Sequence, residues 1–251
     1  MATAIAHPET PGKPARILPG RRFDHWFFSG MALLMLVTVL LGFAPTYYLA
    51  GVFRAPLPSL IIHLHGAAFS CWILLVGTQT SLVSAGRVDI HRRLGMIGFV
   101  LACLMVVLGV SAATDSLARG AGPAGRDVLF FYIIPLTDML VFSILIFSAY
   151  RNRFNAAAHK RLLLVATSSL LVAAIARWPW AYLHRQAPRA AVISYGFLLM
   201  LVAYDLWSTR KVHRATLWGS ALMVFVYQIR LPIGRTEAWH AFAGWVQAMV
   251  R

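Results

Sequence analysis

The chain has 251 residues, of which 59% are hydrophobic and only 12% are charged, and its formal net charge is +15. Soluble domains carry about 25% charged residues, so the composition excludes a water-soluble globular protein. The basic residues fall in short clusters between long apolar runs, whereas a nucleic-acid-binding protein gathers them on one face. We therefore expect the lipid bilayer to be the partner of most of the surface, and we expect no nucleic-acid partner.

The N-terminal segment, residues 1–25, is polar and contains four prolines, at positions 8, 11, 14 and 19. We expect it to form a disordered cytoplasmic tail. The apolar run that begins near His25 is long enough to span a bilayer. It therefore predicts an uncleaved signal-anchor helix and not a cleavable signal peptide.

Seven apolar segments approach or exceed the 20 or so residues that a helix needs to cross a bilayer. They cover residues 26–50, 58–84, 93–115, 127–150, 159–183, 189–208 and 213–231. The last two are the shortest. We predict an all-α integral membrane helical bundle over residues 26–231, with about seven transmembrane helices, and short loops make sequential helices neighbours.

The distribution of Lys and Arg predicts the orientation in the membrane. If the N-terminus is cytoplasmic, 14 of the 23 basic residues lie in cytoplasmic segments, 8 lie on the opposite side, and Arg177 lies inside a predicted helix. This bias predicts a multi-pass protein of the bacterial cytoplasmic (inner) membrane, with its N-terminus in the cytoplasm and its C-terminus outside.

The C-terminal segment, residues 235–251, is too polar to span, but its apolar residues recur at helical spacing. They are Trp239, Phe242, Trp245, Val246 and Met249. Thr236 is the expected N-cap. The pattern predicts an amphipathic helix that lies in the outer interface, anchored by its tryptophans. A helix packed against the bundle is an equally good interpretation.

A polar stripe marks the second predicted helix. His65, Trp72 and Gln79 are seven residues apart, so they lie on nearly one face, which we expect to point into the bundle and away from lipid. One interpretation is a cofactor or proton pathway in which His65 is a ligand or an acid/base group. The other is interhelical hydrogen bonding that only fixes the packing.

Two ionisable residues are predicted to lie within the bilayer, Asp138 in the fourth helix and Arg177 in the fifth. Such residues are costly in lipid and are usually functional or paired. We expect Arg177 to form an ion pair with Asp138. The pair would be either a buried substrate or proton site, or a structural link between neighbouring helices.

Three histidines, His91, His159 and His213, precede or open the third, fifth and seventh helices and so share one depth at the inner interface. Neutral imidazole is a good ligand for haem or a metal, so the three could bind a cofactor. Alternatively, they are solvated and lie near lipid phosphates, an interpretation that is stronger for His213. The two cysteines have no partner at metal-ligand spacing, and we predict no metal-ion site.

The order of these motifs resembles a bacterial family of predicted polytopic membrane proteins that is described only as a domain of unknown function. The resemblance covers about residues 60–180 and is carried by His65, Gln79, His91, Arg92, Leu94, Gly95, His159, Arg161 and Arg177. The family implies no established activity. More loosely, such His-bearing bundles resemble membrane b-type cytochromes and oxidase-assembly factors, which implies haem b or a quinone as cofactor and respiratory-chain components as partners.

The cytochrome resemblance is incomplete. Those proteins place two histidines on one helix about half a membrane apart, and here Gln79 stands at that distance from His65. A single haem could still use one histidine from each of two helices, such as His91 and His159 at the inner level. Covalent attachment is excluded because no Cys-x-x-Cys-His is present.

Three functional hypotheses follow. The first is a haem- or quinone-linked redox protein, or a factor in respiratory-enzyme assembly, with His65, His91 and His159 as the cofactor-binding residues. The second is a proton-coupled transporter that uses Asp138 and Arg177. The third is a lipid-binding or structural membrane protein. A hydrolase is disfavoured because the chain has no Gly-x-Ser-x-Gly or His-Glu-x-x-His, and we assign no catalytic residue.

Overall fold

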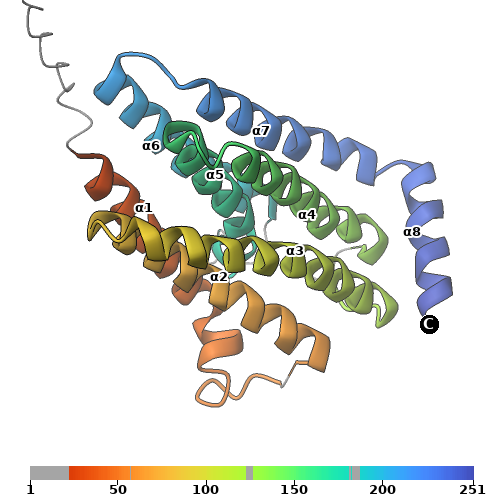
Figure 1. The fold of residues 1–251 in the computed structure, drawn as a ribbon. Coiled ribbons are helices and arrows are strands. Elements are labelled where there is room, and N and C mark those ends of the chain that lie inside the picture. The colour runs from red at the N-terminus through yellow and green to blue at the C-terminus, as the bar shows by residue number, and fades with distance from the viewer. Residues whose placement is uncertain (1–22, 57, 123–126, 181, 183–186) are drawn as a thin grey trace, which may run out of the picture.

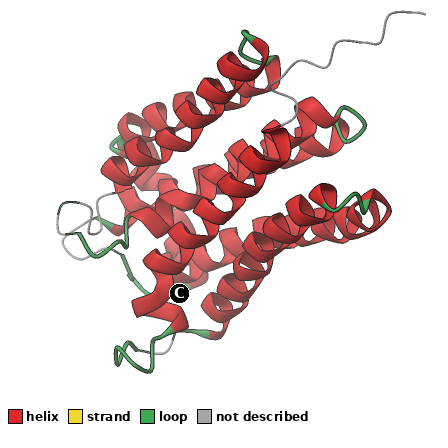
Figure 2. Cartoon of the chain, turned by 90° about the vertical axis from the view of Figure 1, so that its left-hand side faces the viewer, coloured by secondary structure: helices red, strands yellow, loops and turns green. Residues whose placement is uncertain are grey.

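The computed structural model describes residues 23–56, 58–122, 127–180, 182 and 187–251. These residues form helices and connecting loops, and no strand occurs among them (Figure 2). The elements are α1 (Asp24–Phe43), a π-helical turn η2 (Ala44–Tyr48), α2 (Leu60–Ser84), α3 (Val88–Ala118), α4 (Val128–Arg151), α5 (Ala156–Ile175), α6 (Ala187–Thr209), α7 (Arg214–Gly234) and α8 (Glu237–Val250).

Seven of these helices are long and apolar enough to cross a membrane, which confirms the predicted all-α membrane bundle. The expected tail, residues 1–25, lies almost wholly outside the described residues, and α1 begins at Asp24. The fifth helix is shorter than expected and ends at Ile175. Pro179 has no N–H and restricts the residue before it, which disfavours continuation of the helix beyond Ile175.

We name the two ends of the bundle by the chain. The N-terminal face is the end at which α1 begins, and the C-terminal face is the end at which α7 finishes. Successive spanning helices alternate in direction between these faces (Figure 1). The described connections on the N-terminal face are short, so each helix packs against the next one along the chain.

Helix α5 is the centre of the bundle and packs against α1, α4, α6 and α7. Its sequence, AAAHKRLLLVATSSLLVAAI, places small residues on every side, which lets neighbouring helices approach closely. The pair formed by α2 and α3 lies on one side of this centre, where α2 packs on α1 and α3 packs on α4. The pair formed by α6 and α7 lies on the other side (Figure 1).

Helix α1 approaches α5 tightly at Gly42. A Cβ atom added there would overlap the backbone of Ala174, with the carbonyl oxygen nearest and the carbonyl carbon at 2.7 Å. The next residues turn into η2, where Pro45 cannot donate a backbone hydrogen bond and disturbs the regular ladder. The end of α1 is therefore seated tightly on α5.

Helix α8 turns away from the end of α7 and lies across the ends of α3 and α4 (Figure 1). Thr236 caps it as expected, because its hydroxyl accepts from the Trp239 N–H at 3.2 Å. One face packs on the bundle: Trp239 donates to the Leu129 carbonyl at 2.9 Å, and Ala243 is fully buried. The opposite face leaves Phe242, Trp245 and Met249 exposed, so the helix packs on the bundle and also presents an apolar surface.

The docking of α8 on α4 is expected to depend on pH through His240 and Asp127. Both ring nitrogens of His240 face acceptors, the Thr236 carbonyl at 2.9 Å and the Asp127 carboxylate at 2.5 Å. The Thr236 carbonyl and then the Asp127 carboxylate raise the pKa of His240. Partial burial acts to raise the pKa of Asp127, but the hydrogen bonds from His240 and the Leu129 N–H outweigh it and lower that pKa.

Protonated His240 stabilises the docked helix. This contribution is complete at a pH below the ordinary histidine pKa, and it is lost as pH rises through the raised pKa of His240 in the docked state. Ionised Asp127 also stabilises the docked helix. This contribution is complete at a pH above the ordinary aspartate pKa, and it is lost as pH falls through the lowered pKa of Asp127 in the docked state. We therefore expect α8 to be best protected from hydrogen–deuterium exchange between about pH 4 and 6.5, after correction for intrinsic exchange. In His240→Gln the loss of protection above this window should vanish; an unchanged pH profile would contradict the assignment.

Candidate functional site

A cavity of about 650 Å³ opens between α1, α2, α3, α4 and α5 on the half of the bundle nearer the N-terminal face. Its inner wall is apolar and includes Met31, Met35, Trp72 and Leu75. Trp72 is buried, and its indole N–H donates to the Thr167 hydroxyl at 3.3 Å, so it fixes α2 against α5. This volume is typical of sites that take a cofactor or a drug-sized molecule.

His159 lines this cavity from the first turns of α5. The helix begins after Asn155, whose side chain caps the Ala158 N–H. The Nδ1 atom of His159 lies 2.8 Å from the Ala149 carbonyl of α4. A carbonyl can only accept, so Nδ1 carries the proton, and the neutral ring keeps the Nε2 lone pair free. This is the arrangement by which proteins orient a ligating histidine.

His91 lines the same cavity from the first turn of α3. Its Nδ1 atom is buried and has no hydrogen-bond partner. The two rings, His91 and His159, are close enough to interact electrostatically. Gln79 of α2 also lines the cavity, and its Oε1 atom is likewise buried without a partner. The structure thus brings His91, His159 and Gln79 together, with polar atoms that no described residue satisfies.

The rim of the cavity is strongly basic. His25, Arg92, Arg153 and Lys160 all line it, from α1, α3, the loop after α4 and α5 respectively. Arg153 lies over two aromatic rings, with its guanidinium carbon 4.5 Å from the Tyr150 ring centre. An apolar chamber with a cationic rim suits an amphiphilic molecule whose polar edge carries negative charge.

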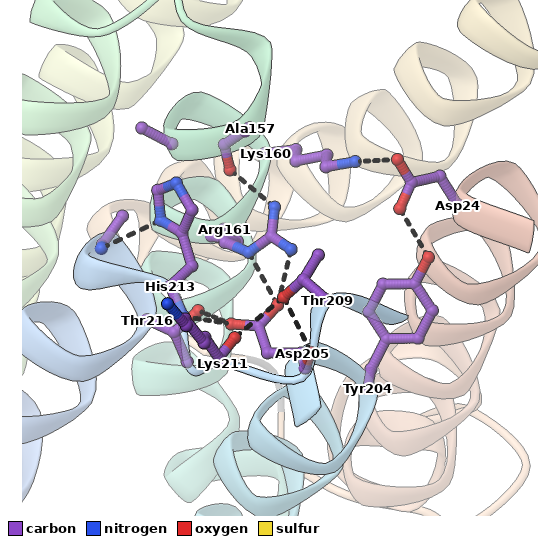
Figure 3. A network of polar contacts seen from close by, with 12 residues as sticks. Asp24, Ala157, Lys160, Arg161, Tyr204, Asp205, Thr209, Lys211, His213 and Thr216 are labelled. Carbon is purple, nitrogen blue, oxygen red and sulfur yellow. Dashed lines mark hydrogen bonds and ion pairs between the residues drawn. The ribbon is translucent and has the colours of Figure 1, made fainter. Parts of the chain in front are cut away.

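Lys160 is held at the rim by an ion pair with Asp24, at 2.5 Å, that joins α5 to the start of α1. The other Asp24 oxygen accepts from the Tyr204 hydroxyl of α6, also at 2.5 Å. Figure 3 shows this chain of contacts beside the neighbouring Arg161 pair. Asp24 therefore ties three helices together at the mouth of the cavity.

Arg161 points away from the cavity and forms a fully buried ion pair with Asp205 of α6 (Figure 3). Its Nε and Nη2 atoms donate to one carboxylate oxygen at 2.8 and 2.5 Å. The other oxygen accepts from the His213 N–H at 3.0 Å and from the Thr216 hydroxyl at 2.6 Å. Asp205 thus accepts four hydrogen bonds, and these link α6 to α5 and to the start of α7.

The structure separates His213 from the other two histidines. His213 is the N-cap of α7, where its Nδ1 accepts from the Ala215 N–H at 3.1 Å. It does not line the cavity. Burial, and then the nearby Arg161, lower the pKa of His213, which agrees with a neutral ring that accepts a hydrogen bond.

His65 also lies outside the cavity. It is 14 residues from Gln79 on α2, which is about 21 Å along the helix axis. Its ring centre lies 4.1 Å from that of Phe69, with the two ring planes tilted by 33°, and its Nδ1 atom is buried without a partner. The three histidines proposed as cofactor ligands therefore do not form one site: His91 and His159 share a cavity, and His65 lies nearer the C-terminal face.

The expected pair between Arg177 and Asp138 is wrong. Asp138 pairs instead with Arg230 of α7, at 2.6 Å. Arg177 follows the end of α5, is exposed, and lies over the Phe43 ring at 4.8 Å. The prediction failed because it extended α5 past Ile175. It also counted Arg230 among the eight basic residues on the side opposite the cytoplasm, whereas that side chain is only 2% exposed.

Sequence reasoning missed several polar residues of these sites. Asp205 and Arg230 each stand within an apolar run, the same signal that identified Asp138, so both could have been found. The rim residues Arg153 and Lys160 carry no such signal, because basic residues at a membrane surface are common.

Comparison with protein-family models, curated proteins and solved structures found no match for this chain.

Proposed function

We propose that this protein binds haem b in the cavity on its N-terminal face and exchanges electrons with a respiratory partner in the bacterial cytoplasmic membrane. The observation that carries the proposal is the pair formed by His91 and His159, which come from different helices and line one large apolar chamber. Haem needs an axial ligand, for which histidine is a common choice, an apolar pocket and cations for its two carboxylates.

The residues present fit that group. His159 would supply Nε2, because its Nδ1 is engaged by the Ala149 carbonyl. His91 has a buried ring nitrogen without a protein partner, which a ligand would satisfy. Arg92 and Arg153 at the rim would bind the carboxylates. When bound, haem would supply one-electron redox chemistry, and the protein would orient it and exclude water.

The distribution of basic residues supports the location of this site. The N-terminal face holds the cationic rim and the segments richest in Lys and Arg, so the positive-inside rule favours the cytoplasm for that face. Anionic lipids of the cytoplasmic leaflet would then lie beside the rim. Electron exchange would take place at the cytoplasmic side of the membrane.

A quinone is the second candidate ligand. The buried, unpartnered polar atoms of His91 and Gln79 favour its reduced form, because a quinol has two hydroxyls that can donate hydrogen bonds to the Gln79 Oε1 atom and to a ring nitrogen of His91. The apolar wall would hold the isoprenoid chain. Both ligands are flat, apolar and redox-active, and they differ in whether a histidine nitrogen must ligate iron.

The test is an ultraviolet–visible spectrum of the detergent-purified protein before and after reduction with dithionite, with organic extraction of the same sample for quinones. We expect a Soret band that shifts on reduction. His159→Ala should lower haem content by about tenfold or more, and added imidazole should restore part of it. His65→Ala is the matched control, since it removes a membrane histidine outside the cavity and should leave the band unchanged.

Three results would decide against haem in this cavity. A folded, colourless protein with quinone in the extract would establish the second candidate. A folded protein with neither ligand would remove both. A Soret band that survives in His91→Ala and in His159→Ala but disappears in His65→Ala would move the site to the opposite half of the bundle.

A further inference from the structure

A second, smaller pocket lies between α4, α6 and α7, toward the C-terminal face and apart from the histidine cavity. Its volume is about 100 Å³, enough for a few water molecules or one small ion. Its polar lining comes from Tyr195 of α6 and from Tyr227, Gln228 and Arg230 of α7. Tyr195, Gln228 and Arg230 carry the O–H and N–H donors of this lining, whereas the Tyr227 hydroxyl already donates to the Ser169 carbonyl at 2.7 Å. Such donors suit a ligand that accepts hydrogen bonds.

Arg230 is the central feature of this pocket, and its side chain is only 2% exposed. Its Nη1 donates to Asp138 at 2.6 Å and to the Thr137 hydroxyl at 3.3 Å. The guanidinium carbon lies 3.8 Å from the centre of the Tyr227 ring. The Nε atom is buried and has no partner. A buried donor without an acceptor is costly, so a ligand that accepts from Nε would stabilise the site.

The charges around the pocket constrain that ligand. Asp138 and Arg230 neutralise each other, so an anion added alone would leave a net negative charge in a region of low dielectric. The other titratable groups that interact with Asp138 are Tyr227 of α7 and, through it, Tyr195 of α6. Among the described residues of α3, α5 and α8, which also pack on α4, none adds a titratable group that acts on Asp138.

We propose that this pocket binds a small monovalent anion, such as a one- or two-carbon carboxylate, together with one proton that is taken up by Asp138. The anion accepts hydrogen bonds from Arg230 Nε and the neighbouring donors. The proton neutralises Asp138, so the loaded site carries no net charge. The inference is independent of the haem proposal, because none of these residues lines the histidine cavity.

The test is isothermal titration of formate into the detergent-purified protein, in two buffers of equal pH that differ in their heats of ionisation. We expect saturable binding with uptake of about one proton per formate, and tighter binding as pH falls. Asp138→Asn mimics the protonated acid and should bind formate without proton uptake. The double variant Asp138→Asn/Arg230→Gln stays neutral and nearly isosteric but loses the cation, so its affinity should fall by about tenfold or more.

Arg177→Gln is the matched control, since it removes an exposed arginine near the same face and should not change the titration. Thermal unfolding with and without formate shows whether each variant is folded. If Asp138→Asn alone does not fold, the comparison of the wild type with the double variant still tests whether Arg230 binds the anion. The proposal is overturned if folded wild-type protein gives no saturable heat. It is also overturned if the double variant binds as well as the wild type, or if proton uptake persists in Asp138→Asn.

Discussion

Asp205→Asn is expected to destabilise the protein by about 3–5 kcal/mol, a large share of the free energy of unfolding of most domains. The substitution changes one oxygen to an amide nitrogen and removes the negative charge. Arg161, which is only 4% exposed, would then be a buried cation without a counter-charge. The new amide would also place a donor against the His213 N–H or the Thr216 hydroxyl, both of which now donate to Asp205.

The measurement is the free energy of unfolding by steric trapping or SDS titration in lipid discs. Arg161→Gln combined with Asp205→Asn removes both charges and should recover about half of the loss or more. Asp89→Asn is the matched control, because Asp89 pairs with Arg87 at the surface, where both side chains are more than half exposed, and should have no measurable effect. A loss in Asp205→Asn no larger than in Asp89→Asn would show that the buried pair is not a stabilising link.

Gly42→Val is expected to be the most damaging substitution on α1. At Gly42 even a single Cβ atom would overlap the backbone of Ala174 in the last turn of α5, and helix backbone cannot turn aside as a side chain does. The helices must separate, which costs about 1–3 kcal/mol for modest overpacking and more for a branched residue. Separation of α1 from α5 would also lengthen the Asp24–Lys160 pair at the far end of the same interface.

Gly30→Val on the same helix is the matched control, because nothing lies within 4 Å of a Cβ atom placed there. Thermal unfolding of the two variants in one detergent isolates the clash from any change in helix propensity. Equal melting temperatures would mean that α1 does not approach α5 as closely as the structure shows.

The helices were predictable from sequence because each apolar run is about as long as a helix that crosses a bilayer. The thickness of the bilayer sets that length. Helix ends were less predictable. Residues 176–183 are apolar enough to extend α5, but Pro179 ends it, and Arg177 moves from the expected interior to the surface. The error therefore came from one local backbone effect that hydropathy does not register.

Residue pairs were the least predictable part. Asp138 was recognised as a residue that needs a partner, yet the choice of Arg230 over Arg177 depends on α4 packing against α7, a contact between segments about 90 residues apart. The sequence did predict that His91 and His159 lie at the same depth in the membrane, because each follows a connection on the N-terminal face. That Gln79 joins them and His65 does not is a matter of position along α2, where 14 residues carry the chain across much of the bilayer.

The position of α5 has a consequence for how the protein is made. It is the fifth helix to leave the ribosome, yet α1 and α4 both pack on it, and contacts such as Lys160–Asp24 join residues 136 positions apart. Helices α1 and α4 must therefore reside in the membrane before their common packing partner exists, and Arg161 of α5 enters before Asp205 of α6. During that interval the nascent chain exposes polar groups to lipid, and we expect membrane chaperones or the insertion machinery to shield them until α5 and α6 are both in place.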